Sequence, residues 1–163
     1  MSTNVKSALR LERLVERGVR FASAGRIAEA LQSYAQVCFE TAENDQELLQ
    51  VVRAWVNQGV LNDRQGETQE AIQAWERAWK LSRESSGSPR VQAAGFQGLI
   101  FVALRSPLES RASFLRPAVD QALSRDLPEV HVLIWNLYAG DPDLPLGEAL
   151  PQESGLEARL PCL

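Results

Sequence analysis

Apolar residues recur at helical spacing through the middle of the chain, and the clearest stretch is 54–81, AWVNQGVLNDRQGETQEAIQAWERAWKL. In its first half they recur every three or four positions around Gly59, where a small residue allows a second helix to approach closely. In its second half the rhythm returns with the small Ala71 beside the large Trp75. Between the halves, Gly66 can adopt the left-handed conformation that ends a helix. The pattern predicts two helices joined by a tight turn at 65–68.

This hairpin resembles the tetratricopeptide repeat, in which an aromatic residue, a small residue, a turn glycine and an Ala-x3-aromatic-x2-Ala motif follow at fixed spacings. The matching residues are Trp55, Gly59, Gly66, Ala71, Trp75 and Ala78. Two positions depart from the family pattern, since Gln58 stands where the family usually has Leu and Asn62 where it often has Tyr. The resemblance implies an all-α fold, a right-handed α-solenoid built from stacked helical hairpins.

Weaker copies of the hairpin flank it. Upstream, Gly18, Gly25, Ala30 and Tyr34 precede Gly59, Gly66, Ala71 and Trp75 by a constant 41 positions. Downstream, Ala94, Gly98 and Phe101 follow Trp55, Gly59 and Asn62 by 39 positions, and Pro117 then interrupts the pattern. We expect short helices near 109–115 and over about 117–124. These spacings exceed the usual 34, so the chain resembles the longer tetratricopeptide class of about forty residues.

The expected organisation is an N-terminal segment, about three repeats, a closing helix and a flexible, acidic, Pro-rich tail. The corresponding ranges are 1–10, 11–124 (divided into 11–45, 46–87 and 88–124), 127–139 and 140–163. The closing helix would cover the last hairpin. Alternatively, its broad apolarity, which includes Trp135 and Tyr138, favours contact with a partner or with a second copy of the chain.

Composition and charge narrow the function. The chain is 45% hydrophobic and 23% charged, with a net charge of −4. Residues 141–163 carry five carboxylates and one arginine, so they account for the whole of that charge and leave a neutral body. This balance predicts no nucleic-acid partner. The first residues do not form a secretory leader, and no apolar run approaches membrane-spanning length, so we expect a cytoplasmic protein with no membrane partner.

The sequence offers no arrangement typical of catalysis. The one histidine, His131, has no serine, cysteine or acid pair positioned by spacing to make it a base or a ligand. Cys38 and Cys162 lie far apart and neither belongs to a CxxC motif. We therefore expect no enzyme activity, no metal and no cofactor.

The resemblance also implies a concave groove lined by the first helix of each hairpin. Transfer by register gives the candidate groove residues Val15, Val19, Arg53, Val56, Asn57, Val60, Arg64, Gln92, Phe96 and Leu99. Co-chaperone repeats use five such positions to bind a terminal carboxylate, and only Asn57 matches, which argues against that use. We expect the groove to bind a peptide or an amphipathic helix. The alternative is closure by the tail segment LGEALPQESGLEARL or by a second copy of the chain.

The sequence thus predicts a non-catalytic adaptor that presents a groove to a protein or peptide partner. A second hypothesis is a self-assembling homo-oligomeric scaffold that associates through Trp135 and the closing helix. A third is a small secretion chaperone, an assignment that rests on chain length alone.

Overall fold

The computed structural model describes residues 3–85 and 87–106, which form five α-helices and no strand. This part of the chain confirms the expected all-α class. The chain divides into two compact units, Met1–Val102 and Ala103–Leu163. The described helices belong to the first unit, apart from the last turn of the fifth helix. The third expected repeat, 88–124, falls across this division, and the expected helices beyond residue 106 lie outside the described residues.

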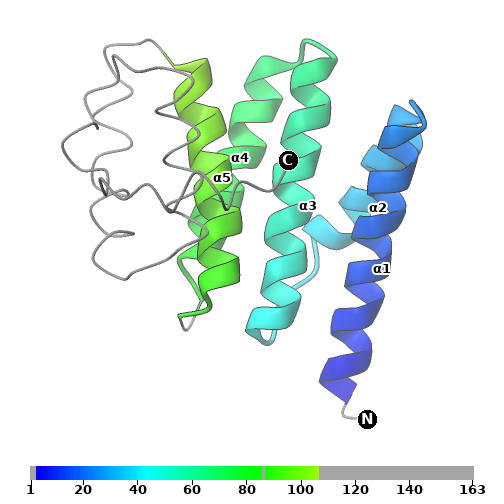
Figure 1. Cartoon of the computed structure of the whole chain (residues 1–163), viewed down its shortest axis with the longest axis vertical. Coiled ribbons are helices and arrows are strands. Elements are labelled where there is room, and N and C mark those ends of the chain that lie inside the picture. Colours follow the sequence, from blue (N-terminus) through cyan, green and yellow to red (C-terminus); the bar gives the residue numbers. More distant parts are fainter. Residues whose placement is uncertain (1–2, 86, 107–163) are drawn as a thin grey trace, which may run out of the picture. The chain divides into compact units, whose positions relative to one another are not determined.

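The helix bounds follow the predicted break points closely (Figure 1). The helices are α1 (Thr3–Ser23), α2 (Ile27–Cys38), α3 (Asp45–Arg64), α4 (Thr68–Ser82) and α5 (Pro89–Arg105). The predicted turn at 65–68 matches the connection between α3 and α4 except that Thr68 already belongs to α4. The N-terminal segment 1–10 is not separate from the first repeat, because α1 begins at Thr3.

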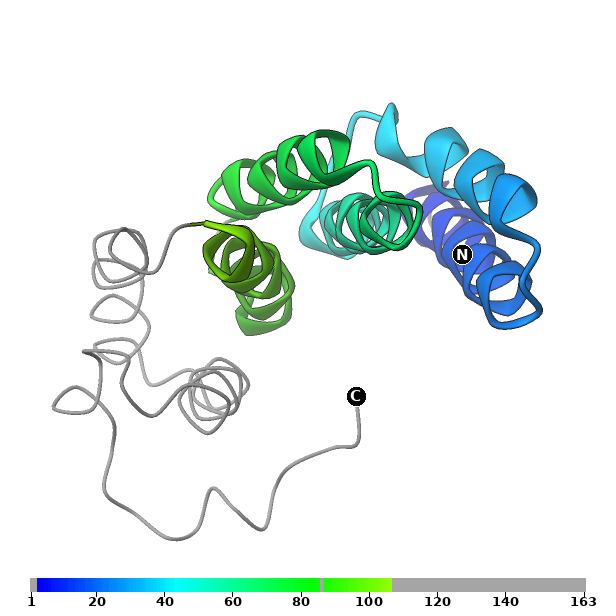
Figure 2. The same cartoon turned by 90° about the horizontal axis from the view of Figure 1, so that it is seen from above.

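The five helices form two layers, which Figure 2 shows in cross-section. Helices α1, α3 and α5 lie in one layer, called here the first layer, and α2 and α4 lie in the second layer. Each helix of the second layer packs against the first-layer helix that precedes it, so α1 with α2 and α3 with α4 form two hairpins. Helix α3 also contacts α1 and α2.

The same glycine turn ends α1 and α3. Gly25 has φ 75° and Gly66 has φ 84°, values that glycine adopts without the steric cost of a side chain. After each glycine, the backbone N–H of the next residue donates to a carbonyl five positions earlier, Arg26 to Phe21 and Glu67 to Asn62, both at 2.9 Å. These bonds use carbonyls that would otherwise lack a partner at the helix end. The 41-residue spacing therefore recurs in the backbone geometry.

Helix α3 has an additional start signal. The Asn44 side chain accepts a hydrogen bond from the Glu47 N–H at 3.0 Å, and the Glu47 carboxylate accepts one from the Glu43 N–H at 2.9 Å. This reciprocal arrangement is similar to a capping box, which satisfies amide groups that the helix leaves unpaired. It also explains how Glu47 can be buried at the junction with the preceding hairpin.

The core of the described helices consists of two clusters, one under each hairpin. The first joins α1, α2 and α3 and includes Leu11, Val15, Tyr34 and Val51. The second joins α3, α4 and α5 and includes Val52, Val56, Trp75, Val91 and Val102. Burying a side chain of this size contributes about 1.5–3 kcal/mol, so the interfaces between layers hold the hairpins together.

Glycine and an aromatic ring meet at the same place in both hairpins. A Cβ atom at Gly18 would lie 2.4 Å from a Tyr34 ring carbon, and one at Gly59 would lie 2.3 Å from Trp75 Nε1. Both pairs were predicted to correspond at a spacing of 41. The Trp75 indole also donates to the Val56 carbonyl at 3.1 Å. These two positions therefore require glycine, because the aromatic rings occupy the space that a side chain would fill.

Gly98 does not repeat this relationship in the described part of the chain. Instead, a Cβ atom at Gly98 would lie 2.9 Å from the Trp75 carbonyl oxygen, so Gly98 packs against α4. The expected helix beyond Pro107 lies outside the described residues.

Candidate functional site

A depression on the first layer lies between the C-terminal halves of α1 and α3. It has a volume of about 200 Å³. Its lining residues are Val19, Ala22 and Ser23 from α1, Tyr34 from α2, and Asn57, Val60, Leu61 and Arg64 from α3. We call this set the α1–α3 groove. The helical turn places residues three or four positions apart on one helix face, which is why Asn57, Val60 and Arg64 face it together.

Tyr34 forms the floor of the groove although it belongs to the second layer. Its side chain is 2% exposed. Because Gly18 has no side chain, the ring passes across α1 at close range. Asn57 lines the same depression as Tyr34. Burial raises the pKa of Tyr34 above its ordinary value, an effect that interaction with the Asn57 side chain and the Arg53 charge partly oppose, so the floor is a neutral phenol at physiological pH.

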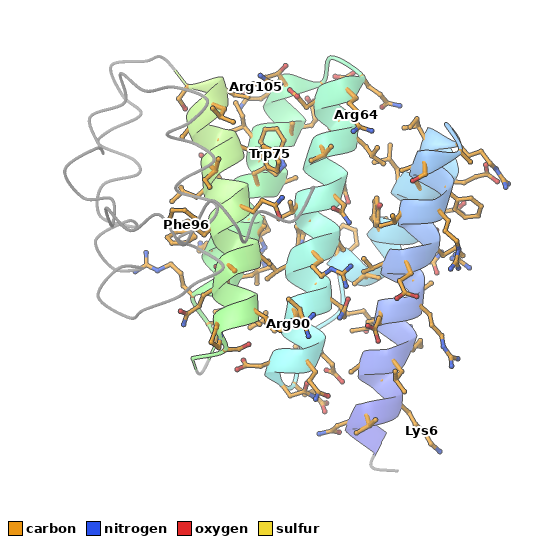
Figure 3. All side chains as sticks on the ribbon, in the orientation of Figure 1. Lys6, Arg64, Trp75, Arg90, Phe96 and Arg105 are labelled. Atoms are coloured by element: carbon orange, nitrogen blue, oxygen red, sulfur yellow. The ribbon has the colours of Figure 1, made fainter. Side chains whose placement is uncertain are left out.

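Charge is confined to the rim. Arg64 is exposed at the C-terminal end of α3, as Figure 3 shows. Val19 on the opposite helix is 41% exposed, and Val60 is partly exposed. The groove can therefore offer two aliphatic contacts, an amide and one accessible guanidinium, which is a combination suited to an apolar side chain beside a carboxylate.

Four of the ten predicted groove residues come together here. These are Val19, Asn57, Val60 and Arg64. Arg53 and Gln92 are partly exposed but do not line this depression. The Arg53 guanidinium donates to the Gln50 side chain at 3.0 Å, which holds it along its own helix.

The other four predicted groove residues are buried, which corrects their assignment as contact residues. Val15 is 0% exposed within the first core cluster and Val56 is 4% exposed within the second. Phe96 is 2% exposed and meets Trp79 edge to face, with ring centroids 6.2 Å apart. Leu99 is 5% exposed. A helix turns about 100° per residue, so a small error in register turns a groove position into a packing position.

Four lining residues, Ala22, Ser23, Tyr34 and Leu61, are not among the ten predicted groove residues. The signal for Tyr34 was present, because its pairing with Gly18 implies that the ring crosses the first helix at close range. Other predictions cannot be compared with this site. Trp135, Tyr138, His131, the closing helix 127–139 and the tail 140–163 lie outside the described residues, as does any closure of the groove by that tail.

A larger depression of about 900 Å³ lies at the connection between α2 and α3. Its lining combines Phe39 and Trp55, whose rings meet edge to face with centroids 6.1 Å apart, with the carboxyl side chains of Glu40, Glu43, Asp45 and Glu84. Among the residues that the structure describes, no group of three His, Cys, Asp or Glu side chains is placed to hold a metal ion. Its lining combines side chains at the edge of the core with residues of the connection between α2 and α3.

Cys38 borders the same depression but is poorly suited to act as a nucleophile. Its side chain is buried, and burial raises the pKa of the thiol to about 12. The thiol donates a hydrogen bond to Gln58 at 3.3 Å. Since the thiolate is the reactive form, this cysteine is protonated and inert at neutral pH.

Comparison with known protein families, with curated proteins and with solved structures finds no match to this chain. Within the part of the chain that the structure describes, no helix combines the length and apolarity needed to cross a lipid bilayer.

Proposed function

We propose that the protein is a non-catalytic interaction module, a tetratricopeptide-like α-solenoid of about three hairpins, that binds a peptide or helix of a partner protein in the α1–α3 groove. The observation that carries the proposal is the convergence of Val19, Asn57, Val60 and Arg64 around the Tyr34 floor. Each lies on a first-layer helix, where the tetratricopeptide resemblance puts ligand contacts.

Two further observations support a repeat architecture. The contact between Gly18 and Tyr34 recurs between Gly59 and Trp75, and the left-handed turn glycines recur at the same spacing. Rigid hairpins of this kind present a preformed surface, so binding costs little conformational entropy in the module itself.

The groove chemistry indicates the class of ligand. Val19 and Val60 provide an aliphatic wall on either side, Asn57 offers an amide, and Arg64 offers a charged donor at one end. An apolar residue of the ligand would occupy the wall, with an acidic residue about one helical turn away reaching Arg64. At this volume, one side chain rather than a whole small molecule fills the depression.

The test is selection of peptide ligands from a displayed library of natural sequences, followed by affinity measurement with Val60→Glu. A buried carboxylate beside Val19 would weaken binding by roughly tenfold or more. Ala28→Glu is the matched control, because Ala28 is exposed on α2 and lies outside the groove lining. Circular dichroism establishes that both variants keep the parent helix content.

If peptides bind the parent, Val60→Glu and Ala28→Glu equally, the groove is not the binding surface. If no peptide is enriched and light scattering finds a homo-oligomer that Val60→Glu dissociates, the same surface serves self-assembly instead. Either outcome rejects the proposal in its present form.

A further inference from the structure

The surface of α1 that points away from α3 is basic along its whole length. It carries Lys6, Arg10, Arg13, Arg17 and Arg20, all exposed. Their spacing is 4, 3, 4 and 3 residues, which confines them to an arc of about 80° on an ideal helix. We call this set the basic face. Figure 3 shows Lys6 extending from α1 on the side opposite α3.

The equivalent surface of α3 is covered by another helix. A shift of 41 residues, which superimposes the two hairpins in sequence, converts the five cations into Glu47, Val51, Ala54, Gln58 and Leu61. Val51, Ala54 and Leu61 belong to the core cluster that includes Tyr34, Val37 and Cys38 of α2. Gln58 accepts a hydrogen bond from Cys38. In the repeat register, this surface is the one on which the second helix of the preceding hairpin packs.

Within the described part of the chain, α1 contacts chiefly α2 and α3, and its basic face is exposed at the positions where α2 covers α3. The 4-3-4-3 spacing is the seam spacing of two helices packed side by side. Apolar residues remain at the margins of the seam. Leu9 and Leu14 line the same shallow depression of about 580 Å³, and Leu9 is 38% exposed.

Intramolecular partners occupy only part of the basic face. Arg10 forms an ion pair with Glu40 at 2.6 Å. Arg17 donates to Ser33 at 3.2 Å and to Gln36 at 3.5 Å. Among the residues that the structure describes, no hydrogen bond or ion pair involves the side chains of Lys6, Arg13 or Arg20. These three are seven residues apart, about 10.5 Å along the helix.

We propose that the basic face binds an acidic helix of a partner protein, which docks along α1 where α2 docks along α3. Lys6, Arg13 and Arg20 would each meet a carboxylate that recurs every seven residues in the partner. The five cations face no carboxylate of α1 within their arc, because Glu12 and Glu16 lie on the groove side of the helix. The site is separate from the α1–α3 groove.

Other occupants fit the same charges less well. The basic face is one helix wide, with Glu12, Glu16 and Glu40 nearby. A nucleic acid binds more tightly to a broad basic surface that contacts many phosphates. A membrane surface would require aromatic or aliphatic side chains beside the cations. At the edges of the basic face, the exposed apolar side chain is chiefly that of Leu9. A second copy is also poorly matched, because its sequence nowhere places three carboxylates at successive intervals of seven residues.

The experiment uses the full chain and a synthetic helical peptide whose length is two heptads plus about three further helical turns. The peptide carries Glu at 4-3-4-3 spacing. An isomeric peptide has the same composition but distributes Glu around the helix. We expect the patterned peptide to bind roughly tenfold or more tightly than its isomer at low salt. The triple variant Lys6→Gln, Arg13→Gln, Arg20→Gln should lose a similar factor for the patterned peptide.

The control triple variant is Arg77→Gln, Lys80→Gln, Arg90→Gln, which removes the same charge from exposed positions elsewhere and should retain binding. Val60→Glu should also retain it, which separates this proposal from the groove. Equal binding of the two peptides would overturn the proposal in favour of diffuse attraction. Tighter binding of a duplex DNA or of phosphatidylserine vesicles, lost in the first triple variant, would overturn it in favour of those partners.

Discussion

Trp75 occupies the space in which a side chain at Gly59 would begin. Its indole nitrogen lies 2.3 Å from the ideal Cβ position at Gly59, and the same nitrogen donates to the Val56 carbonyl at 3.1 Å. The Val56 carbonyl thus holds the Trp75 ring over Gly59, where glycine is the one residue type that leaves room for it. The phenol of Tyr34 stands in the same relation to Gly18, so the contact is a repeated means of bringing two helices together.

Gly59→Ala should destabilise the protein despite the higher helix propensity of alanine. Propensity alone favours Ala by about 1 kcal/mol, whereas forcing the buried indole to move costs about 1–3 kcal/mol or more. We expect a lower urea midpoint with an unchanged slope. In a Trp75→Leu background the same substitution should become neutral or stabilising. If Gly59→Ala destabilises the Trp75→Leu protein as much as it destabilises the parent, the Trp75 ring is not the reason for a glycine at position 59.

The sequence was most informative where a contact requires one residue type. The spacing of Gly18, Gly25 and Tyr34 predicted the helix ends and the close packing, because only glycine fits a left-handed turn or an aromatic ring against the backbone. The groove was only partly predictable. Val15 and Val19 are both aliphatic and lie four residues apart on α1, yet one is 0% and the other 41% exposed.

Register and charge explain what the sequence reading missed. Tyr34 reaches the groove from the second layer. Because it lies far along the chain from the first-layer groove positions, its sequence position did not indicate that it joins them. The basic face was hidden by a neutral sum of charges, because Glu12 and Glu16 cancel two cations in number but lie on another side of α1. Net charge carries no information on which helix face holds which sign.

The Asn44 cap should support the second hairpin measurably. Asn44→Ala removes the acceptor for the Glu47 N–H and should cost about 1 kcal/mol, while Asn44→Asp, which keeps an acceptor oxygen, should cost much less. Equilibrium urea unfolding measures both. Equal losses for the two variants would indicate that the side-chain oxygen does not act as a cap.

The Tyr34 and Asn57 side chains should stabilise one another. Tyr34→Phe leaves the ring in place against Gly18 and removes only the hydroxyl, so we expect a loss of about 0.5–1.5 kcal/mol. Asn57→Ala should cost a similar amount, and the double variant should cost less than the sum of the two. Strict additivity in a double-mutant cycle would contradict a direct interaction between these two side chains.

Cys38 should make stability fall at alkaline pH. Burial raises the pKa of its thiol from 9.0 to about 12, so between these values the unfolded chain loses a proton that the native protein keeps. The thiol's contribution is therefore complete below pH 9 and declines as pH rises towards 12, by up to about 1.4 kcal/mol per pH unit. Cys162→Ser provides the background, so that Cys38 is the one thiol present.

In that background, urea unfolding at about pH 7 and about pH 10.5 should show a larger alkaline loss than in the matched Cys38→Ala variant, by roughly 2 kcal/mol. Iodoacetamide should label Cys38 slowly in buffer and rapidly in urea, because alkylation requires an accessible thiolate. Parallel losses in the two variants, or rapid labelling of the native protein at neutral pH, would show that the thiol is accessible to water. The pocket beside Phe39 would then have to open far enough to expose the sulfur.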